Sequence, residues 1–231
     1  MVPALAASDG GLSTVRIEDE RRGSPTILDR IVQKWSTPIM ARPKEFDRDV
    51  ALDRAMTVFW SKGFAATSTD DLLTAMQIGR QSMYDSFGDK RRLYLEALAR
   101  YQQGSVDGHI ARLRGKQSPL AGVEAMLAGV VAEERAVRER GCMGVGAVSE
   151  FGCSDPEVSR LRAASERRLR AALVARLEAA RAAGELRAGL DVEIATMFIG
   201  TAMQGLQVGA RAGSPVKALR DVARFAIASL R

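Results

Sequence analysis

Apolar residues recur three or four positions apart along most of this chain, a spacing that puts them on one face of a helix. Glycines separate these runs, and helices commonly end at a glycine because it adopts left-handed backbone angles easily. The pattern therefore predicts an all-α fold. One helix is expected through Leu72, Leu73 and Met76, and the others over residues 47–62, 80–87, 89–114, 119–138, 143–151, 156–183, 191–212 and 215–230.

Two short helical runs flank a tight turn between residues 67 and 90. One of Thr67, Ser68 and Thr69 is expected to cap the first run by accepting a hydrogen bond from a free backbone N–H. Residues 77–79 form the predicted turn, and residues 80–87 form the second helix. Met83 and Phe87 are four positions apart on its inner face. This layout is that of a helix-turn-helix DNA reader.

The outer face of the second helix carries groups that suit the edges of bases. Arg80 can bind guanine O6 and N7 together, and Gln81 can do the same with adenine N6 and N7, each pair being worth roughly 1–3 kcal/mol of discrimination. Hydroxyl and amino groups around the helix can hold phosphates. The full set of predicted DNA contacts is Arg42, Lys44, Thr67, Ser68, Thr69, Arg80, Gln81, Ser82, Tyr84 and Lys90.

Composition and charge add limits to this picture. The chain has 231 residues, of which 46% are apolar and 27% charged, enough for a substantial core in one large or two small domains. Its net charge of +6 invites a nucleic-acid interpretation, yet residues 40–101 hold ten basic residues against nine acidic ones. Particular residues must therefore carry the DNA argument. No apolar run is long enough for a membrane span, no secretory leader is recognisable, and two cysteines favour a cytoplasmic protein.

The segments GFAATSTDDLLTAM (63–76) and SMYDSFGDKRRLY (82–94) resemble the N-terminal domain of the tetracycline-repressor (TetR/AcrR) family. The resemblance implies a homodimer that binds double-stranded DNA at a near-palindromic operator. It also implies a C-terminal helical domain and a repressor released when a small-molecule effector fills a pocket there. The matching residues are Phe59, Gly63, Phe64, Thr67, Ser68, Leu72, Ile78, Met83, Tyr84, Phe87, Lys90 and Leu93.

This sequence departs from the family's pattern in the turn. Gln77 stands where members usually have glycine, and a left-handed conformation there costs about 1 kcal/mol. Gly79 stands where a hydroxyl often caps the reader helix, although glycine is a tolerated cap.

Three domains are expected on this basis. Residues 1–39 mix small, polar and charged residues without a sustained period and are expected to be a disordered tail, either native or an upstream extension of the reading frame. Residues 40–88 form the helix-turn-helix domain, and residues 89–231 form the domain for ligand binding and dimerisation. The predicted pocket consists of Met126, Val130, Met143, Val148, Phe151, Leu161 and Met197. The predicted dimer interface consists of Phe198, Ala202, Gly205, Leu206, Gly209, Leu219, Val222 and Phe225.

Two alternatives stay open. Cys142 and Cys153 lie roughly 15 Å apart if a helix separates them, which is too far for a disulfide bond. Burial within the fold is expected because free cysteine is commonly buried, and a redox sensor is the competing hypothesis. The second alternative is a helical effector-binding protein without DNA affinity. His109 is the single histidine, on a polar stretch with no catalytic motif or metal-ligand cluster beside it. No enzyme, metal site or cofactor is expected.

Overall fold

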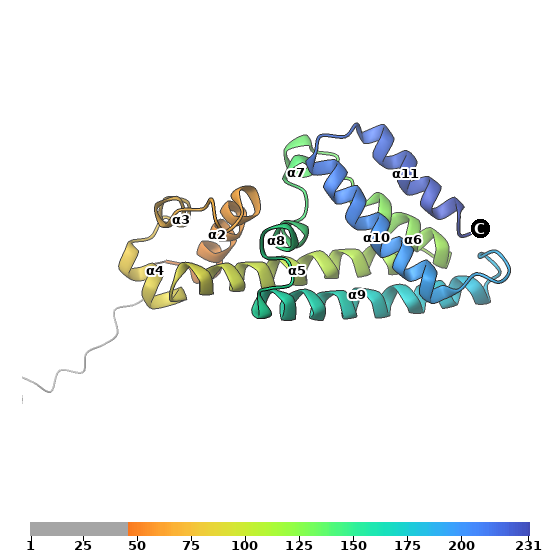
Figure 1. Ribbon diagram of the computed structural model, residues 1–231, viewed down its shortest axis with the longest axis horizontal. Coiled ribbons are helices and arrows are strands. Elements are labelled where there is room, and N and C mark those ends of the chain that lie inside the picture. Colours follow the sequence, from red (N-terminus) through yellow and green to blue (C-terminus); the bar gives the residue numbers. More distant parts are fainter. Residues whose placement is uncertain (1–45) are drawn as a thin grey trace, which may run out of the picture. The chain divides into compact units, whose positions relative to one another are not determined.

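The computed structural model describes residues 46–231, and every regular element in that part of the chain is a helix (Figure 1). The predicted all-α fold is confirmed. The helices are α2 (Arg48–Lys62), α3 (Thr69–Met76), α4 (Arg80–Phe87), α5 (Lys90–Arg114), α6 (Pro119–Ala128), α7 (Arg135–Arg140), α8 (Met143–Phe151), α9 (Pro156–Ala182), α10 (Val192–Arg211) and α11 (Val216–Ala228).

Local chemistry fixes the ends of α3. Ser68 is the cap, and its side chain accepts the Asp71 N–H while the Asp71 carboxylate accepts the Ser68 N–H, so two otherwise unpaired donors are satisfied reciprocally. Gln77 ends the helix with φ 58° and ψ 43°, so the residue that replaces the family's usual glycine does adopt the left-handed conformation. Gly79 caps α4 without a side-chain hydrogen bond.

One hydrophobic core joins α2, α3 and α4 to α5, α8 and the start of α9. Phe59 of α2 and Tyr94 of α5 lie at its centre with ring centroids 5.1 Å apart, edge to face. Met83 and Phe87 bury the inner face of α4 in the same core. The reader helices are therefore held against long helices of the remaining chain.

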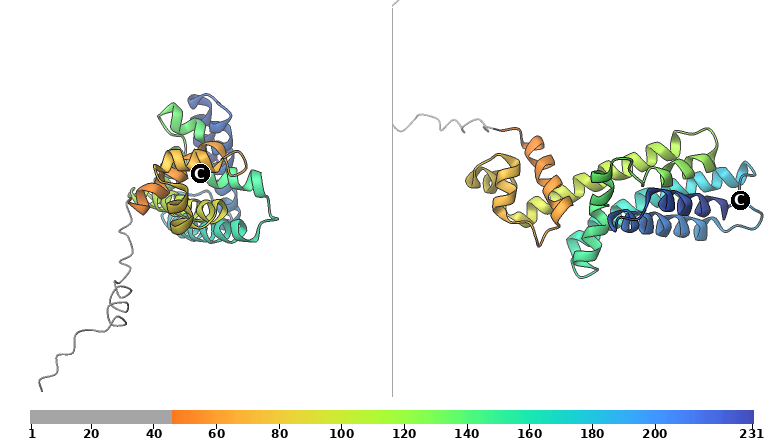
Figure 2. Two further views of the ribbon diagram at one scale, coloured as in Figure 1. Left: turned by 90° about the vertical axis from the view of Figure 1, so that its left-hand side faces the viewer. Right: turned by 90° about the horizontal axis from the view of Figure 1, so that it is seen from above.

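A second core lies between α5, α6, α9, α10 and α11. Helix α9 lies along α5, and α10 and α11 lie next to one another (Figures 1 and 2). Helix α5 belongs to both cores, since Leu93 and Tyr94 are buried in the first and Leu113 in the second. No helix of the described residues is both long and apolar enough to cross a membrane.

The single helix predicted over residues 119–138 is wrong. Helix α6 ends at Ala128, and α7 begins at Arg135. The Arg112 side chain lies against Gly129, where an added Cβ would be 2.3 Å from its Nε. The apolar spacing continues past the end of α6 because Val131, which follows the break, is also buried, so the pattern did not reveal where the helix ends.

Candidate nucleic-acid interface and effector cavity

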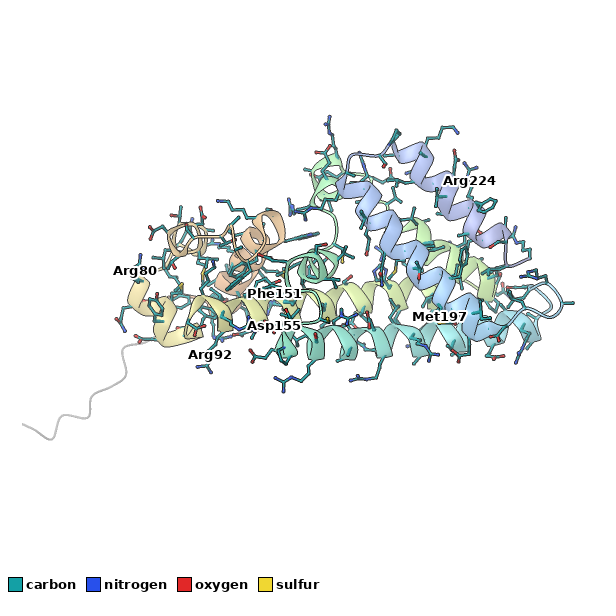
Figure 3. All side chains as sticks on the ribbon, in the orientation of Figure 1. Arg80, Arg92, Phe151, Asp155, Met197 and Arg224 are labelled. Carbon is teal, nitrogen blue, oxygen red and sulfur yellow. The ribbon has the colours of Figure 1, made fainter. Side chains whose placement is uncertain are left out.

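The outer face of α4 is exposed, as the sequence predicted from its pattern. Met83 is fully buried, whereas Tyr84 is 43% exposed and Gln81 is exposed to solvent. Arg80 is also exposed, at the start of α4 (Figure 3). Such a helix has one face held rigidly and the other free to enter a groove.

Acidic neighbours hold the two predicted base-reading side chains. An Arg80 guanidinium nitrogen lies 2.8 Å from an Asp70 carboxylate oxygen, and the Gln81 amide donates to Asp85 at 2.8 Å. Both pairs lie at the surface, where an ion pair contributes only about 0–1 kcal/mol. A partner that offers better acceptors can therefore displace them.

The predicted phosphate contacts differ in their exposure to solvent. Thr67 is only 1% exposed, and its hydroxyl donates to the Gly63 carbonyl at 2.5 Å, so the structure removes it from the set. Sequence could not separate Thr67 from Ser68, because burial follows from the fold of the loop before α3. Ser68, Thr69, Ser82 and Lys90 keep full or partial exposure. Arg42 and Lys44 lie outside the described residues.

Lys90 stands at the first position of α5, where the helix dipole disfavours a cation. Its Nζ lies 4.4 Å from the centroid of the Phe64 ring. A cation over the face of an aromatic ring is attracted electrostatically. This contact offsets the unfavourable position and holds the amino group beside the loop before α3.

Arg54 was missed by sequence reasoning. Its guanidinium donates to the Gln77 side-chain carbonyl at 2.8 Å and to the Met76 carbonyl at 3.2 Å. It thereby ties α2 to the turn between α3 and α4 and satisfies carbonyls at the end of α3. Arg54 and Gln77 are 23 positions apart, so no local sequence pattern indicates this pairing.

Helix α8 is linked to the loop between α2 and α3. The Glu150 carboxylate accepts the backbone N–H groups of Phe64 at 2.9 Å and Ala65 at 2.5 Å. The Phe151 ring packs on Phe64 and on Tyr94, with centroids 5.6 and 5.5 Å apart. This set of contacts, which we call the α8 anchor, was not predicted either.

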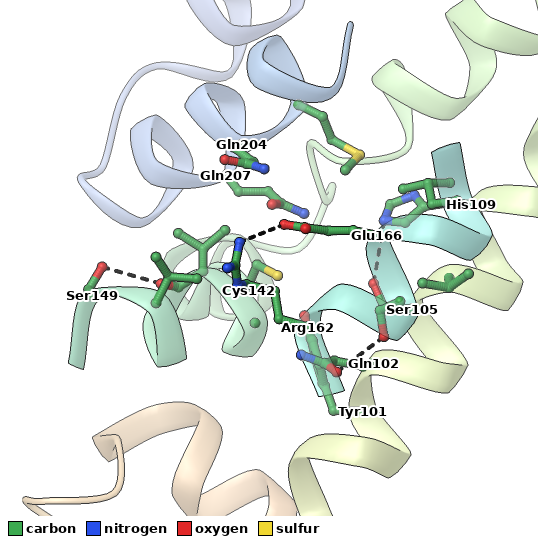
Figure 4. Close-up of a pocket in the computed structure, with 17 residues that line it drawn as sticks. Tyr101, Gln102, Ser105, His109, Cys142, Ser149, Arg162, Glu166, Gln204 and Gln207 are labelled. Carbon is green, nitrogen blue, oxygen red and sulfur yellow. Dashed lines mark hydrogen bonds and ion pairs between the residues drawn. The ribbon is translucent and has the colours of Figure 1, made fainter. Parts of the chain in front are cut away.

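Helix α8 also borders a cavity of about 210 Å³, the α8 cavity, between α5, α8, α9 and α10 (Figure 4). Its walls mix apolar and polar groups. Arg162 and Glu166 pair at 3.0 Å across one side, and Ser165 donates to Gln102 at 3.1 Å. The apolar wall is formed by Val106, Val145, Val148, Leu169 and Met203.

His109 borders this cavity and is only 7% exposed, although the sequence around it is polar. Burial first, and then the charge of Arg112, lower the pKa of His109 to about 4, and the imidazole is neutral at pH 7. One ring nitrogen, Nε2, lies 3.4 Å from the Ser105 hydroxyl.

The seven predicted pocket residues are scattered. Val148 borders the α8 cavity, Val130 borders a neighbouring one, and Met143 borders a third between α2, α8 and α10. Met126 is buried in the second core, Phe151 and Leu161 pack against the first, and Met197 is 59% exposed on α10. Helical periodicity identified apolar residues without showing which of them face empty space.

The predicted dimer residues divide between two environments. Leu206 and Leu219 are buried inside the subunit, Ala202 packs against the same core, and Gly209 is partly exposed. Phe198, Gly205, Val222 and Phe225 are exposed, Phe225 at 74%. Ile194 and Val208, missed by the sequence analysis, and Met197, predicted for the pocket, add exposed apolar surface on α10.

Neither cysteine is buried, contrary to expectation. Cys153 is exposed after α8, and Cys142 is partly exposed at the start of α8, where it borders the α8 cavity. The predicted helix between them is present, and both thiols are free. Within residues 46–231, no three histidine, cysteine, aspartate or glutamate side chains gather as a metal site.

Comparison with known proteins places this geometry in a family. Residues 51–97 match the family model of bacterial regulatory proteins of the tetR family, and residues 119–226 match the tetracyclin repressor-like C-terminal domain. The HTH-type transcriptional regulator YezE of Bacillus subtilis (strain 168) is 34% identical over 159 residues, covering 68% of this chain and 81% of YezE. The HTH-type transcriptional repressor ComR of Escherichia coli (strain K12) is 30% identical over 190 residues, covering 79% and 88%.

A solved structure agrees with these relatives. It is that of a cysteine mutant of the TetR family transcriptional regulator CifR complexed with 26-bp double-strand operator DNA. It is 32% identical to this chain and covers 82% of it and 100% of the CifR chain, with a TM-score of 0.67. These relatives are transcriptional regulators rather than enzymes. The chain therefore belongs to the TetR family of bacterial transcriptional regulators.

Proposed function

We propose that this protein is a ligand-responsive transcriptional repressor that binds a palindromic operator as a homodimer in the cytoplasm. The observation that carries the proposal is α4, which presents Arg80, Gln81 and Tyr84 to solvent from a helix anchored by fully buried Met83. The operator DNA in the CifR structure and the repressor name of ComR support it.

Base reading is assigned to Arg80 and Gln81. On binding DNA, their side chains leave the carboxylates of Asp70 and Asp85 and form hydrogen bonds with base edges. Ser68, Thr69, Ser82, Tyr84 and Lys90 hold phosphates around them. Ser68 suits this role because its hydroxyl accepts the Asp71 N–H and keeps its own proton for a phosphate oxygen. Arg42 and Lys44 remain predicted contacts of an arm before α2.

Dimerisation is assigned to the outer faces of α10 and α11. Several large apolar side chains on these faces are exposed to solvent rather than buried in the subunit's own core. A two-fold axis at this surface would set the two α4 helices one DNA turn apart, about 34–36 Å, or a multiple of that spacing. The apolar members of the surface are Ile194, Met197, Phe198, Val208, Val222 and Phe225.

Release by an effector is assigned to the α8 cavity, with α8 as the coupling element. Val145 and Val148 of α8 border the cavity, while Glu150 and Phe151 of the same helix form the α8 anchor. A ligand that shifts α8 must therefore move or release the loop that leads into α3. Helix α5 shares this role because it belongs to both cores.

The decisive experiment selects duplexes from a random pool with the purified protein and footprints the winners across a salt series. We expect a palindromic site protected on one face of the duplex. Arg80→Ala should weaken it by about 1–3 kcal/mol and relax the preference at one base pair. The matched control is Arg160→Ala, an exposed arginine on α9, which should leave the footprint unchanged. No salt-sensitive binding to any duplex would instead favour the helical effector-binding protein without DNA affinity.

A redox-responsive repressor is the second candidate, because Cys142 borders the α8 cavity at the start of α8. Mass spectrometry after a mild oxidant, paired with operator binding, tests it. A modified Cys142 with unchanged operator affinity would exclude this candidate.

A further inference from the structure

A second cavity of about 450 Å³, the arginine cavity, adjoins the α8 cavity. The two cavities share the side chains of Tyr101, Ser105, His109, Cys142 and Gln207 as border. The arginine cavity lies between α2, α5, α7 and α10 and the segment that joins α6 to α7. The two cavities therefore lie on either side of these five side chains.

Positive charge dominates the arginine cavity. Arg100, Arg112 and Arg138 border it, against the single carboxylate of Asp53. Arg100 is neutralised, because it pairs with both Asp49 and Asp53. Arg112 and Arg138 have no carboxylate partner among residues 46–231, and Arg138 donates instead to the backbone carbonyls of Ala132 and Glu133. Two uncompensated guanidinium groups thus border one cavity.

His109 supplies an independent sign of an absent partner. It is more than nine-tenths buried at the border of the two cavities, and its Nδ1 has no hydrogen-bond partner. Buried polar atoms in native proteins are nearly always paired with protein, water or ligand. Arg112 is close enough to contribute to the lowered pKa of His109, after burial.

Glycines keep the arginine cavity open. Gly104 and Gly108 face it from the middle of α5, although glycine is unfavourable inside a helix. A Cβ added to Gly104 would meet nothing within 4 Å, so a larger side chain there would extend into free space. Gly129 lets the Arg112 side chain lie against the end of α6.

We propose that the effector is an amphipathic molecule with one carboxylate, which binds between Arg112 and Arg138 and within reach of the unpaired His109 Nδ1, while its apolar tail extends into the α8 cavity. A guanidinium holds a carboxylate through two parallel hydrogen bonds. The tail packs on Val106, Val148, Leu169 and Met203. This inference rests on the proposed function, since it names the ligand class of the same effector region.

The test uses the full chain and a series of probes: hexanoate, octanoate and decanoate, each compared with its own primary amide. Isothermal titration should show the acid binding roughly tenfold or more tightly than the amide, because a hydrogen bond to a charged group is lost in the amide. Arg112→Gln and Arg138→Gln should each remove most of that difference. Arg160→Gln, on the surface of α9, should retain it. Equal affinity of acid and amide, or no binding by any acid, overturns the proposal.

Gly104→Leu provides a variant that keeps its fold, because leucine is a better helix former than glycine. It should abolish carboxylate binding without lowering the melting temperature. Unchanged binding by this variant would overturn the assignment to the arginine cavity. Operator binding is measured on the same samples, so the two claims can fail separately. A protein that binds its operator but no carboxylate refutes only the ligand class, and one that binds carboxylates but no duplex refutes only the repressor.

Discussion

The helices around the turn between α3 and α4 are tightly packed, whereas the helices around the two cavities leave space unfilled. In the first region Phe59, Phe64, Tyr94 and Phe151 form a continuous aromatic cluster, and α4 rests on fully buried Met83. In the second, glycine-lined space remains and the buried His109 Nδ1 has no partner. A rigid platform suits the reading of base edges, whereas unfilled space with unpaired polar groups suits a ligand. Helix α8 borders both regions and can therefore connect them.

The largest expected effect concerns the closed core. Phe59→Ala removes a ring that is 1% exposed and should lower the free energy of unfolding by about 3–5 kcal/mol. Val148→Ala, at the open α8 cavity and 41% exposed, should cost less than about 1 kcal/mol. Urea denaturation of both variants measures the difference. Similar losses at the two positions would contradict the contrast between a closed and an open region.

The next effect concerns the outer face of α11. Phe225 is 74% exposed in the subunit, so Phe225→Ala should leave subunit stability unchanged. It should weaken dimerisation by about 2 kcal/mol, roughly thirtyfold, if the ring is central to the interface. Sedimentation equilibrium measures the dissociation constant. Val50→Ala, at an exposed apolar side chain on α2, is the matched control, and an equal effect there would remove α11 from the interface.

A smaller effect tests the link between the regions. Glu150→Ala removes the acceptor of the Phe64 and Ala65 N–H groups and should cost about 1 kcal/mol of stability. Hydrogen exchange should accelerate at those two amides, and the response of operator affinity to an effector should diminish. Glu178→Ala, at a carboxylate on α9 that pairs with Arg181 away from both cavities, is the control. Slow exchange that persists in Glu150→Ala would show that the α8 anchor does not hold the loop.

The smallest effect lies in the capping box of α3. The hydrogen bond from Lys62, followed by those from the Ser68 backbone and side chain, lowers the pKa of Asp71 from 3.8 to about 2. A depressed folded-state pKa contributes stability above the unfolded value, and that contribution is lost as the pH falls through the folded one. In the Asp71→Asn variant, the free energy of unfolding should therefore fall less steeply between about pH 4 and pH 2 than in the unsubstituted protein. Thermal unfolding at a series of pH values measures this slope. Asp85→Asn serves as the comparison, and an unchanged slope in Asp71→Asn would argue against the box.

The sequence by itself determined what depends on near neighbours in the chain. Helical spacing separated buried Met83 and Phe87 from exposed Arg80, Gln81 and Tyr84. The sequence limited the cap of α3 to three residues, of which the structure selects Ser68, and it placed Gln77 in the turn, where the structure shows the left-handed conformation. These features arise within one or two helical turns, where side-chain spacing and backbone geometry suffice.

Only the tertiary structure decided which faces meet and which stay open. Glu150 reaches Phe64 across 86 positions, and Thr67 is buried by a loop that its own pattern does not describe. Periodicity shows that a face is apolar without showing whether it meets a core, a cavity or a second subunit. For that reason Leu219 and Phe225 were grouped together, although one is buried in the subunit and the other exposed. The same limit concealed the arginine cavity, because residues from α2, α5, α7 and α10 enclose it only after the helices pack.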